Sequence, residues 1–229
     1  MTEISQKKKT IFLVDDHPMM REGVRRLVRE SHVWEICGEA SSAIPAVDAI
    51  IQANPDLVIL DISLPDKSGL ELIKDLSARA YGLNILVFSM HDEFLYAERV
   101  MRAGAKGYLT KDSPTESLSE AIECVLQGKL YLSKAVSDHI LKTLSRTASG
   151  QVGIAKLTDR ELEIFELIGR CKTNAQIADK LTISARTVDA HRSNIRAKLS
   201  LPDAPTLMRE AVLWVELVGK NSRPDSDAE

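Results

Sequence analysis

Short apolar runs alternate with amphipathic segments through the first 128 residues of the chain. Runs such as 57–60 (LVIL) contain no polar residue, which is typical of strands in a parallel sheet covered on both faces. We predict strands at residues 11–14, 34–40, 57–60, 85–88 and 107–109. The intervening segments repeat apolar residues at helical spacing, which predicts helices near residues 20–29, 43–53, 70–79, 94–103 and 114–125.

This alternation predicts an α/β fold, a flavodoxin-like, right-handed, doubly wound parallel sheet of five strands. Two local signals refine the helix ends. We expect Gly104 to close the helix that ends at residue 103. We expect Ser113 to cap the helix at 114–125, with Pro114 in its first turn and Glu116 completing a capping box.

Beyond residue 128 the pattern predicts helices only. An amphipathic helix is expected from about Ser133 to Ser145, and the Gly- and Ser-rich stretch 146–153 (RTASGQVG) is typical of a flexible tether. Thr158 and Glu161 have capping-box spacing and start a helix that ends near residue 170. We then expect a short helix capped by Asn174, a tight turn at 182–184, a longer helix at 185–199 capped by Ser184, and a last helix at 205–218.

Four segments follow from these patterns. Residues 1–129 form the α/β domain, residues 130–155 a linker with a short helix, and residues 156–219 a small all-α domain. Residues 220–229 form a polar tail that we expect to be disordered.

Charge is distributed unevenly over the 229 residues, whose formal net charge is −3. Residues 7–128 carry 14 Lys and Arg against 19 Asp and Glu, and residues 156–218 carry 10 against 9. The three cysteines are far apart and lack metal or redox spacing, which favours a reducing compartment. No run of about 18 apolar residues and no signal-peptide pattern occurs, so we expect a cytoplasmic protein without a membrane partner.

Polar side chains follow four of the five predicted strands. In the flavodoxin-like order, these strand ends lie close together at the edge where open α/β sheets bind ligands. A lone Asp after a strand is usually a turn or capping residue. A lone Ser89 is usually a turn hydroxyl, and a lone Lys111 is usually a solvated surface residue. Their coincidence at successive strand ends favours one site, formed by Asp15, Asp16, Asp61, Ser89 and Lys111.

This set of side chains suits phosphoryl chemistry. Three carboxylates in one crevice repel each other, and hard oxygen ligands with room for water suit Mg²⁺. A carboxylate neutralised by a metal can attack phosphorus, and the transferred group then needs positive or hydrogen-bonding partners on its oxygens. Lys111 and the hydroxyl of Ser89 are placed to supply them.

The second half contains a short helix, a tight turn and a longer capped helix, which is the helix-turn-helix plan. Such a second helix enters the DNA major groove. Basic side chains on the longer helix suit phosphates or base edges, namely Arg186, Arg192, Arg196 and Lys198. A small helical bundle with a solvated basic face explains the same pattern equally well.

Residues 10–128 resemble the receiver domain of bacterial two-component response regulators, through the stretches LVDDH, DISLPDKSG, FSMHD and GYLTKDS. The resemblance implies that Asp61 accepts a phosphoryl group from a sensor histidine kinase and that Lys111 holds the phosphate oxygens. It implies a Mg²⁺ cofactor bound by Asp16, Asp61 and the backbone carbonyl of Ser63, with Asp15 acting through water. Ser89 and Tyr108 would be the switch residues, with Tyr108 turning inward as Ser89 moves toward the phosphate. His91 and Ser63 would tune the lifetime of the phosphate.

The second half resembles the LuxR-type DNA-binding domain, through LTDRELEIFELI, NAQIADKLTIS and RTVDAHRSNIRAKL. The joined pair resembles the NarL/FixJ subfamily. This resemblance implies that the helix 184–199 binds double-stranded DNA. It also implies that two chains form a homodimer through their last helices in the active state. The implied DNA contacts, mainly to phosphates, are Arg186, Thr187, His191, Arg192 and Lys198.

One residue departs from the family pattern. The family usually carries Lys after Thr-Val, where this chain has Asp189. A carboxylate there repels phosphates and can accept only from a cytosine amino group. The DNA site is then unusual, or binding is weak.

The sequence therefore predicts a transcription factor, not an enzyme, that is switched by phosphorylation and held inactive at rest by its receiver. Two alternatives remain open at this level. A Mg²⁺-dependent phosphatase with an Asp nucleophile would want a D-x-D pattern after the first strand, and residues 15–17 (DDH) lack it. A protein-interaction switch with a degenerate DNA-binding half is suggested only by Asp189.

Overall fold

The computed structural model describes residues 7–80, 82–145 and 153–221. The chain divides into two compact units, residues 1–136 and 137–229, and each is described by itself. The predicted tether at 146–153 and the predicted tail at 220–229 lie largely outside the described residues. Within the described part of the chain, no helix is long and apolar enough to cross a membrane.

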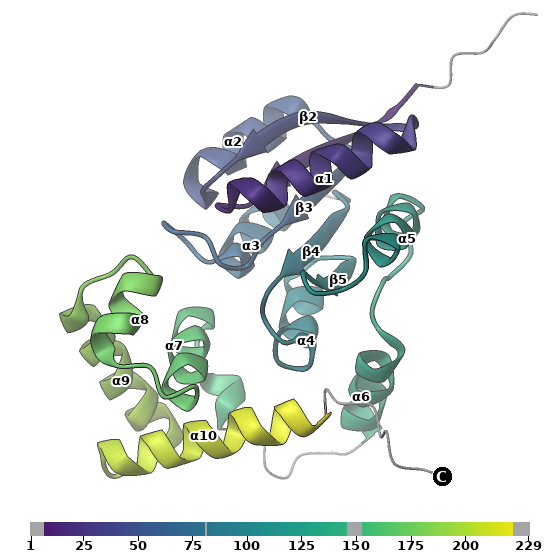
Figure 1. The fold of residues 1–229 in the computed structure, drawn as a ribbon. Helices are drawn as coiled ribbons and strands as arrows, with labels where there is room; N and C mark the ends of the chain where they lie inside the picture. Colours follow the sequence, from purple (N-terminus) through teal and green to yellow (C-terminus); the bar gives the residue numbers. More distant parts are fainter. Residues whose placement is uncertain (1–6, 81, 146–152, 222–229) are drawn as a thin grey trace, which may run out of the picture. The chain divides into compact units, whose positions relative to one another are not determined.

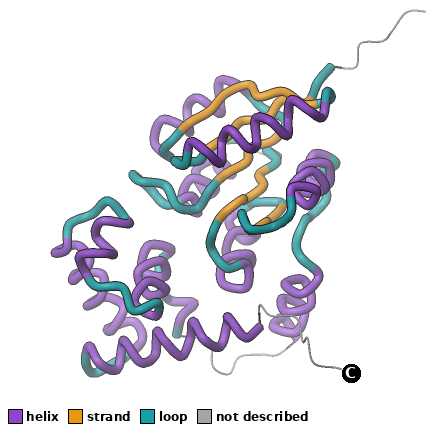
Figure 2. Tube along the Cα trace, in the orientation of Figure 1, coloured by secondary structure: helices purple, strands orange, loops and turns teal. Residues whose placement is uncertain are grey.

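The first unit contains a parallel sheet of five strands in the order β2-β1-β3-β4-β5, which confirms the flavodoxin-like prediction (Figures 1 and 2). Its strands are β1 (Lys9–Val14), β2 (Trp34–Ala40), β3 (Leu57–Leu60), β4 (Ile85–Ser89) and β5 (Gly107–Thr110). β3 and β4 are buried along their whole length, as their lack of polar alternation predicted, whereas the edge strand β2 alternates between less and more exposed residues.

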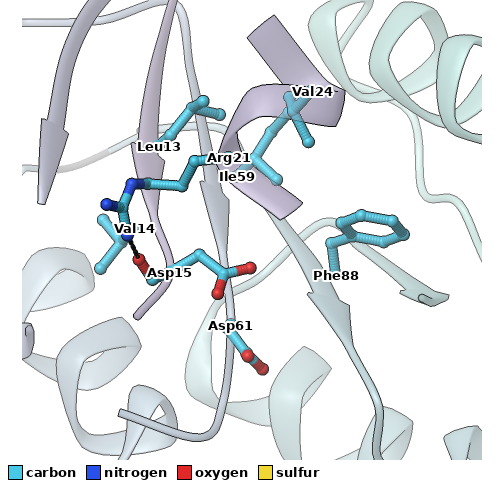
Figure 3. Close-up of a pocket in the computed structure, with 8 residues that line it drawn as sticks. All are labelled: Leu13, Val14, Asp15, Arg21, Val24, Ile59, Asp61 and Phe88. Carbon is cyan, nitrogen blue, oxygen red and sulfur yellow. Dashed lines mark hydrogen bonds between the residues drawn. The ribbon is translucent and has the colours of Figure 1, made fainter. Parts of the chain in front are cut away.

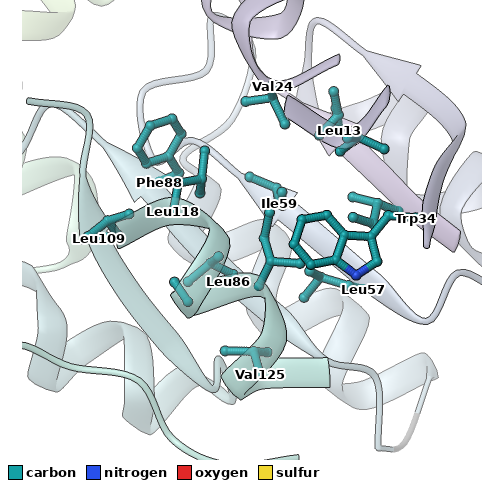
Figure 4. Close-up of a cluster of buried hydrophobic side chains, with 14 residues drawn as sticks. Leu13, Val24, Trp34, Leu57, Ile59, Leu86, Phe88, Leu109, Leu118 and Val125 are labelled. Atoms are coloured by element: carbon teal, nitrogen blue, oxygen red, sulfur yellow. The ribbon is translucent and has the colours of Figure 1, made fainter. Parts of the chain in front are cut away.

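Helices cover both faces of this sheet, and their bounds are α1 (Pro18–Ser31), α2 (Ala43–Ala53), α3 (Gly69–Arg79), α4 (Glu93–Ala103) and α5 (Thr115–Leu126). Apolar residues of α1 and α5 pack against one face of the strands in a single apolar cluster (Figure 4). Trp34, the first residue of β2, belongs to this cluster. α2, α3 and α4 contact one another in series. The register of the strands then decides which residues emerge together at the carboxyl edge.

The predicted cap at Ser113 is wrong. α5 starts at Thr115, Pro114 is its N-cap residue, and no side-chain hydrogen bond caps it. The Ser113 hydroxyl instead lies 2.9 Å from the Thr110 hydroxyl. This contact within the preceding turn uses the Ser113 oxygen that would have capped the helix. Gly104 does close α4, in a left-handed conformation with φ +116°.

The N-terminus of α2 is capped by a residue from a distant loop. Asp66, between β3 and α3, accepts hydrogen bonds from the backbone N–H groups of Ala43 and Ile44, each at 2.8 Å. Ser42, the local N-cap residue, makes no such bond. Burial raises the pKa of Asp66, but the backbone N–H donors outweigh it and hold the pKa below its usual range.

We expect Asp66→Ala to lower the free energy of unfolding by about 1 kcal/mol, because two orphan N–H groups lose their acceptor. Urea titration followed by circular dichroism measures it. Asp48→Ala, in the middle of the same helix, is the matched control: its exposed pairing with Arg79 contributes little. Equal effects of the two substitutions would contradict the capping role.

Among its described residues, the second unit contains helices joined by turns and loops, and no strand. It contains the 3-10 turn η1 (Ile154–Lys156), which the sequence pattern did not predict, and the helices α7 (Asp159–Gly169), α8 (Asn174–Lys180), α9 (Ala185–Leu199) and α10 (Ala204–Asn221). One aliphatic cluster, joined by Phe165 and Trp214, holds them together. α6 (Lys134–Ser145) joins the two units in sequence and lies where a helix was predicted.

The caps of the second unit agree with prediction except at α8. Thr158 and Glu161 form the predicted capping box of α7, and Ser184 caps α9. Thr173, not Asn174, is the N-cap of α8, where it forms a second capping box with Gln176. This frees the Asn174 side chain for other contacts. α10 runs through Asn221, so residues 220 and 221, predicted to be in the tail, are helical.

Candidate functional site

The carboxyl edge of the sheet brings together the side chains predicted to meet there. Asp61 follows β3 and is 2% exposed, and Asp15 follows β1. The ammonium of Lys111, after β5, lies 2.5 Å from Asp61 Oδ2 and 2.6 Å from Asp15 Oδ2. Backbone hydrogen bonds that continue the sheet past its strands, from Asp61 N to Val14 O and from Lys111 N to Ser89 O, set these positions.

The second oxygen of the Asp61 carboxylate is bound from the neighbouring strand. Ser89, at the end of β4, is fully buried and donates its hydroxyl to Asp61 Oδ1 at 2.6 Å. The backbone N–H of Ser63 donates to the same oxygen at 3.2 Å. Each Asp61 oxygen therefore faces the donors that a phosphoryl group attached to it would need.

A second pair of ionisable groups stands beside this cluster. Asp16 Oδ1 is buried and lies 2.6 Å from His17 Nδ1, yet it has no hydrogen bond of acceptable geometry. One ligand atom each from Asp15, Asp16, His17 and Asp61 lie within 4.8 Å of one another. Carboxylate oxygens grouped this closely, with one poorly satisfied, fit a hard divalent cation such as Mg²⁺.

The room next to the cluster is small. A cavity of about 10 Å³ lies between the end of β1 and the end of β3, and its rim includes the carboxylates of Asp15 and Asp61 (Figure 3). The Arg21 guanidinium reaches from α1 to the backbone carbonyl of Asp15. Its Nε also lies 3.3 Å from a carboxylate oxygen of Glu39. Arg21 thus ties the backbone that carries Asp15 to α1 and β2, a contact that no sequence signal indicated.

A close backbone approach requires Gly69 at the start of α3. A Cβ atom there would lie 2.3 Å from the carbonyl oxygen of Asp61 and 2.7 Å from Cα of Ile62. Gly69 N also donates to Ile62 O at 2.8 Å. The absence of a side chain at Gly69 therefore lets α3 approach the backbone of Asp61.

Four residues beside Ser89 form a connected group through His91. Tyr108 on β5 is fully buried and donates its hydroxyl to the backbone carbonyl of His91 at 3.0 Å. The His91 Nε2 lies 2.8 Å from the Ser63 Oγ, and the His91 ring packs in a tilted geometry on Tyr96 of α4, with ring centroids 4.5 Å apart. The inward position of Tyr108 and the contact of Ser89 with Asp61 are thus present together. The His91–Ser63 contact joins residues 28 apart, and no local pattern could have predicted it.

In the second unit, α8, the turn 181–184 and α9 form a helix-turn-helix, with Val188 and Ile195 of α9 facing the core. Arg186 and Thr187 are exposed in its first turn. The backbone N–H of Thr187 donates to Ser184 Oγ at 3.0 Å, and its hydroxyl lies 2.8 Å from the same oxygen. The cap therefore orients the Thr187 side chain.

Two of the other predicted DNA contacts, Lys198 and Arg192, have partners within the unit. Lys198 donates to Glu161, the capping-box residue of α7, at 2.6 Å. Arg192 donates to the side-chain oxygen of Asn174 at 3.2 Å, and the Asn174 amide donates to Asp189 Oδ1 at 2.5 Å. Asp189, the departure from the family pattern, is thus held by the first residue of α8.

His191 is half-buried on α9. Burial is the largest influence on it and, with the neighbouring Arg160 guanidinium, holds the pKa of the imidazole below its usual range, although Glu161 acts in the opposite direction. The neutral imidazole is therefore the form that the folded unit favours.

We expect the second unit to lose stability as the pH falls below about 6.5, because the unfolded chain then binds a proton that the folded unit resists. Urea unfolding at pH 5.5 to 7.5 measures it, followed by Trp214 fluorescence in a Trp34→Phe background. His191→Gln should flatten this part of the pH profile. An unchanged slope in that variant would assign the effect to another group.

The comparisons with known proteins agree on both units. Residues 11–123 match the family described as response regulator receiver domain, and residues 155–211 match bacterial regulatory proteins of the luxR family. The transcriptional regulatory protein DegU of Brevibacillus brevis is 31% identical over 94% of this chain and 98% of its own length. The chain belongs to the NarL/FixJ subfamily of response regulators.

Further similar proteins include one curated relative and two solved structures. The nitrate/nitrite response regulator NarL of Escherichia coli is 32% identical over 92% of this chain and 96% of its own length. A LuxR-family two-component response regulator from Aurantimonas is 34% identical in sequence, with a TM-score of 0.57 over 61% of this chain and all of its own. RcsB from Salmonella enterica, solved bound to a promoter with a phosphomimetic, shares the fold at 22% identity, with a TM-score of 0.60 over 90% of this chain and 99% of its own.

This response regulator therefore combines a receiver domain with a LuxR-type DNA-binding domain, in a family of DNA-binding transcription regulators. Members of this family act with a histidine kinase and bind DNA, and receiver domains bind Mg²⁺ at an acidic pocket. In this chain, Asp15, Asp16 and Asp61 form an acidic cluster at the carboxyl edge of the sheet.

Proposed function

We propose that this response regulator is switched by Mg²⁺-dependent transfer of a phosphoryl group from a sensor histidine kinase to Asp61. The observation that carries the proposal is the pairing of Lys111 Nζ with Asp61 Oδ2 at 2.5 Å and with Asp15 Oδ2 at 2.6 Å. An ammonium that bridges two buried carboxylates can bind a phosphate oxygen when one of those carboxylates becomes an acyl phosphate.

Each residue of the cluster has a distinct task. An oxygen of Asp61 attacks phosphorus as the bond from phosphorus to the donor's nitrogen breaks. The bonding pair stays on that nitrogen, which takes up a proton, so the donor's imidazole leaves as a neutral ring and the transferred group carries its negative charge on the phosphate oxygens. Lys111 and Ser89 hold those oxygens. Asp16, Asp61 and the backbone carbonyl of Ser63 would bind Mg²⁺, which neutralises charge on the transferring group. Asp15 acts through water, since its Oδ1 already accepts from His17 N at 2.8 Å.

Switching follows from the charge that phosphorylation adds. A phosphoryl group brings about −1.5 to −2 charges and three strong acceptors, and the Ser89 hydroxyl is the closest donor on β4. Ser89 and Tyr108 are the proposed switch residues, because the buried Tyr108 hydroxyl holds the carbonyl of His91, two residues beyond Ser89. A change at Ser89 therefore reaches the segment that leads into α4.

The proposed output is binding of a homodimer to double-stranded DNA, with α9 in the major groove. The proposed contacts are Arg186, Thr187, His191, Arg192 and Lys198. For Lys198 and Arg192 to contact DNA, a phosphate must replace their partners in the folded unit, which are Glu161 and Asn174, respectively. Leu213 and Leu217 of α10 are 45% and 62% exposed, and they are the proposed apolar dimer contacts. Trp214 packs on Phe165, which favours a core role for it.

Incubation with acetyl phosphate and MgCl₂ tests the proposal. Phosphate incorporation is read on a phosphate-affinity gel, the oligomeric state by light scattering, and DNA retention by selection from a random library. We expect all three to respond together. Equal DNA retention without the phosphodonor would count against phosphorylation control, and retention of no DNA sequence would favour a protein-interaction switch instead.

A further inference from the structure

The segment after α5 returns to the sheet beside the switch residue Tyr108. Tyr131 N donates to Lys106 O and Tyr108 N donates to Tyr131 O, both at 2.9 Å, and Tyr131 forms a parallel bridge with Gly107. The Tyr131 side chain also packs against the main core of the first unit. The chain that leads to the DNA-binding domain is therefore fastened to β5 by main-chain hydrogen bonds.

Two residues further on, the hydroxyl of Ser133 connects two helices. It accepts a hydrogen bond from the Val136 backbone N–H at 3.2 Å, as a cap at the start of α6. It donates to Glu93 Oε1 at 2.8 Å. Val136 is 1% exposed, so the first turn of α6 is buried as well as capped.

Glu93 is the first residue of α4 and lies four residues after Ser89. The three residues between them include His91, whose carbonyl accepts from the Tyr108 hydroxyl. One short segment therefore contains the hydroxyl that binds Asp61, the contact of Tyr108, and the partner of Ser133. Burial is the largest influence on Glu93 and raises the pKa of its carboxyl, with Asp92 and Asp112 adding to the effect against the Ser133 hydrogen bond.

We infer that Glu93 and Ser133 are positioning residues that transmit the switch from α4 to α6. Residues 131–136, the anchor segment, are held at Tyr131 by β5 and at Ser133 by α4. A shift of the Ser89–Glu93 segment moves the carboxylate that holds the α6 cap. Because hydrogen bonds lose strength steeply with distance and angle, a small shift releases the start of α6. The inference rests on the proposed phosphorylation of Asp61.

The test uses the full chain with Glu93→Ala, Ser133→Ala and Ser133→Thr, and Glu116→Ala as control. Glu116 is an exposed residue in the first turn of α5, so its substitution removes the same charge from an equivalent helix position. The coupling factor is the ratio of the Kd for DNA without phosphodonor to the Kd with acetyl phosphate and MgCl₂. A mere loss of stability would leave this ratio unchanged.

We expect Glu93→Ala and Ser133→Ala to lower the coupling factor by about fivefold or more, and the double variant to lower it no further. Phosphate incorporation at Asp61 should stay within about twofold of the parent, while Ser133→Thr keeps the hydroxyl and the coupling. An unchanged coupling factor in both single variants overturns the inference. So does a parallel loss of phosphate incorporation, which would place the residues at the phosphorylation site itself.

A second measurement does not depend on DNA. Hydrogen exchange of the anchor segment and the first turn of α6 is compared before and after phosphodonor treatment. We expect exchange to rise on phosphorylation in the parent chain and to be high in both states in Ser133→Ala. An anchor segment that exchanges equally in both states, in a parent chain that does incorporate phosphate, overturns the inference. Failure to incorporate phosphate would instead overturn the proposed function.

Discussion

Asp61→Asn is expected to abolish phosphate incorporation from acetyl phosphate and, with it, the phosphodonor-dependent gain in DNA affinity. The amide has nearly the shape of the carboxylate and can still accept from Ser89, whose hydroxyl lies 2.6 Å from Asp61 Oδ1. It has no nucleophilic oxygen for phosphorus, and it removes one of the two carboxylates that Lys111 bridges. The measurement is the phosphorylated fraction on a phosphate-affinity gel, with DNA binding measured in parallel.

Asp66→Asn is the control for that experiment. Asp66 lies in the same loop, but its carboxylate caps α2 rather than facing Lys111. We expect Asp66→Asn to incorporate phosphate normally. Incorporation in Asp61→Asn equal to that of the parent would show that another side chain accepts the phosphoryl group, and would end the assignment of Asp61.

Asp189→Lys is expected to raise DNA affinity about tenfold at low salt and to steepen the fall of log K with log salt by about 0.9, the effect of one added phosphate contact. Asp189 is exposed on α9, and among the described residues no cation forms a salt bridge with it. Its carboxylate repels phosphates, and its neutral partner Asn174 does not cancel the charge. Fluorescence anisotropy with a labelled duplex across a salt series measures both quantities.

The same substitution should change sequence preference. The parent carboxylate can accept from the amino group of cytosine, whereas a lysine donates to guanine. Selection from a random library with each variant reads this directly. Asp179→Lys, which makes the same charge change at an exposed position of α8, should alter affinity without altering the selected bases. Identical selected sites for the parent and Asp189→Lys would show that the side chain does not face a base.

Local patterns were sufficient for most of the secondary structure. β2 and α2 have the bounds that the apolar pattern predicted, because burial on a sheet or helix face imposes a periodicity visible in any short window. α9 also has the predicted bounds, and its N-cap Ser184 was predictable because the capping signal lies in residues next to the helix start. The failures at Ser113 and Asn174 are also local, since a hydroxyl or amide near a helix start has several backbone partners within reach.

The candidate site was predictable for a different reason. Parallel strands connected in a right-handed sense must end at one edge, so residues that follow successive strands converge even when they are far apart in sequence. This topological rule predicts from the sequence alone that Asp15, Asp61, Ser89 and Lys111 meet. It fixes which side chains meet, but not which atoms pair.

The sequence by itself determined the two domains, the order of their elements and the residues that gather at the sheet edge, because these depend on periodicity and on the handedness of the chain. Only the tertiary structure decided the partners that join distant segments: Asp66 with α2, His91 with Ser63, Glu93 with Ser133, and Asn174 with Asp189. Such contacts depend on distances of a few ångströms between elements, and hydrogen bonding is too short-ranged and directional to leave a repeating signal in the sequence.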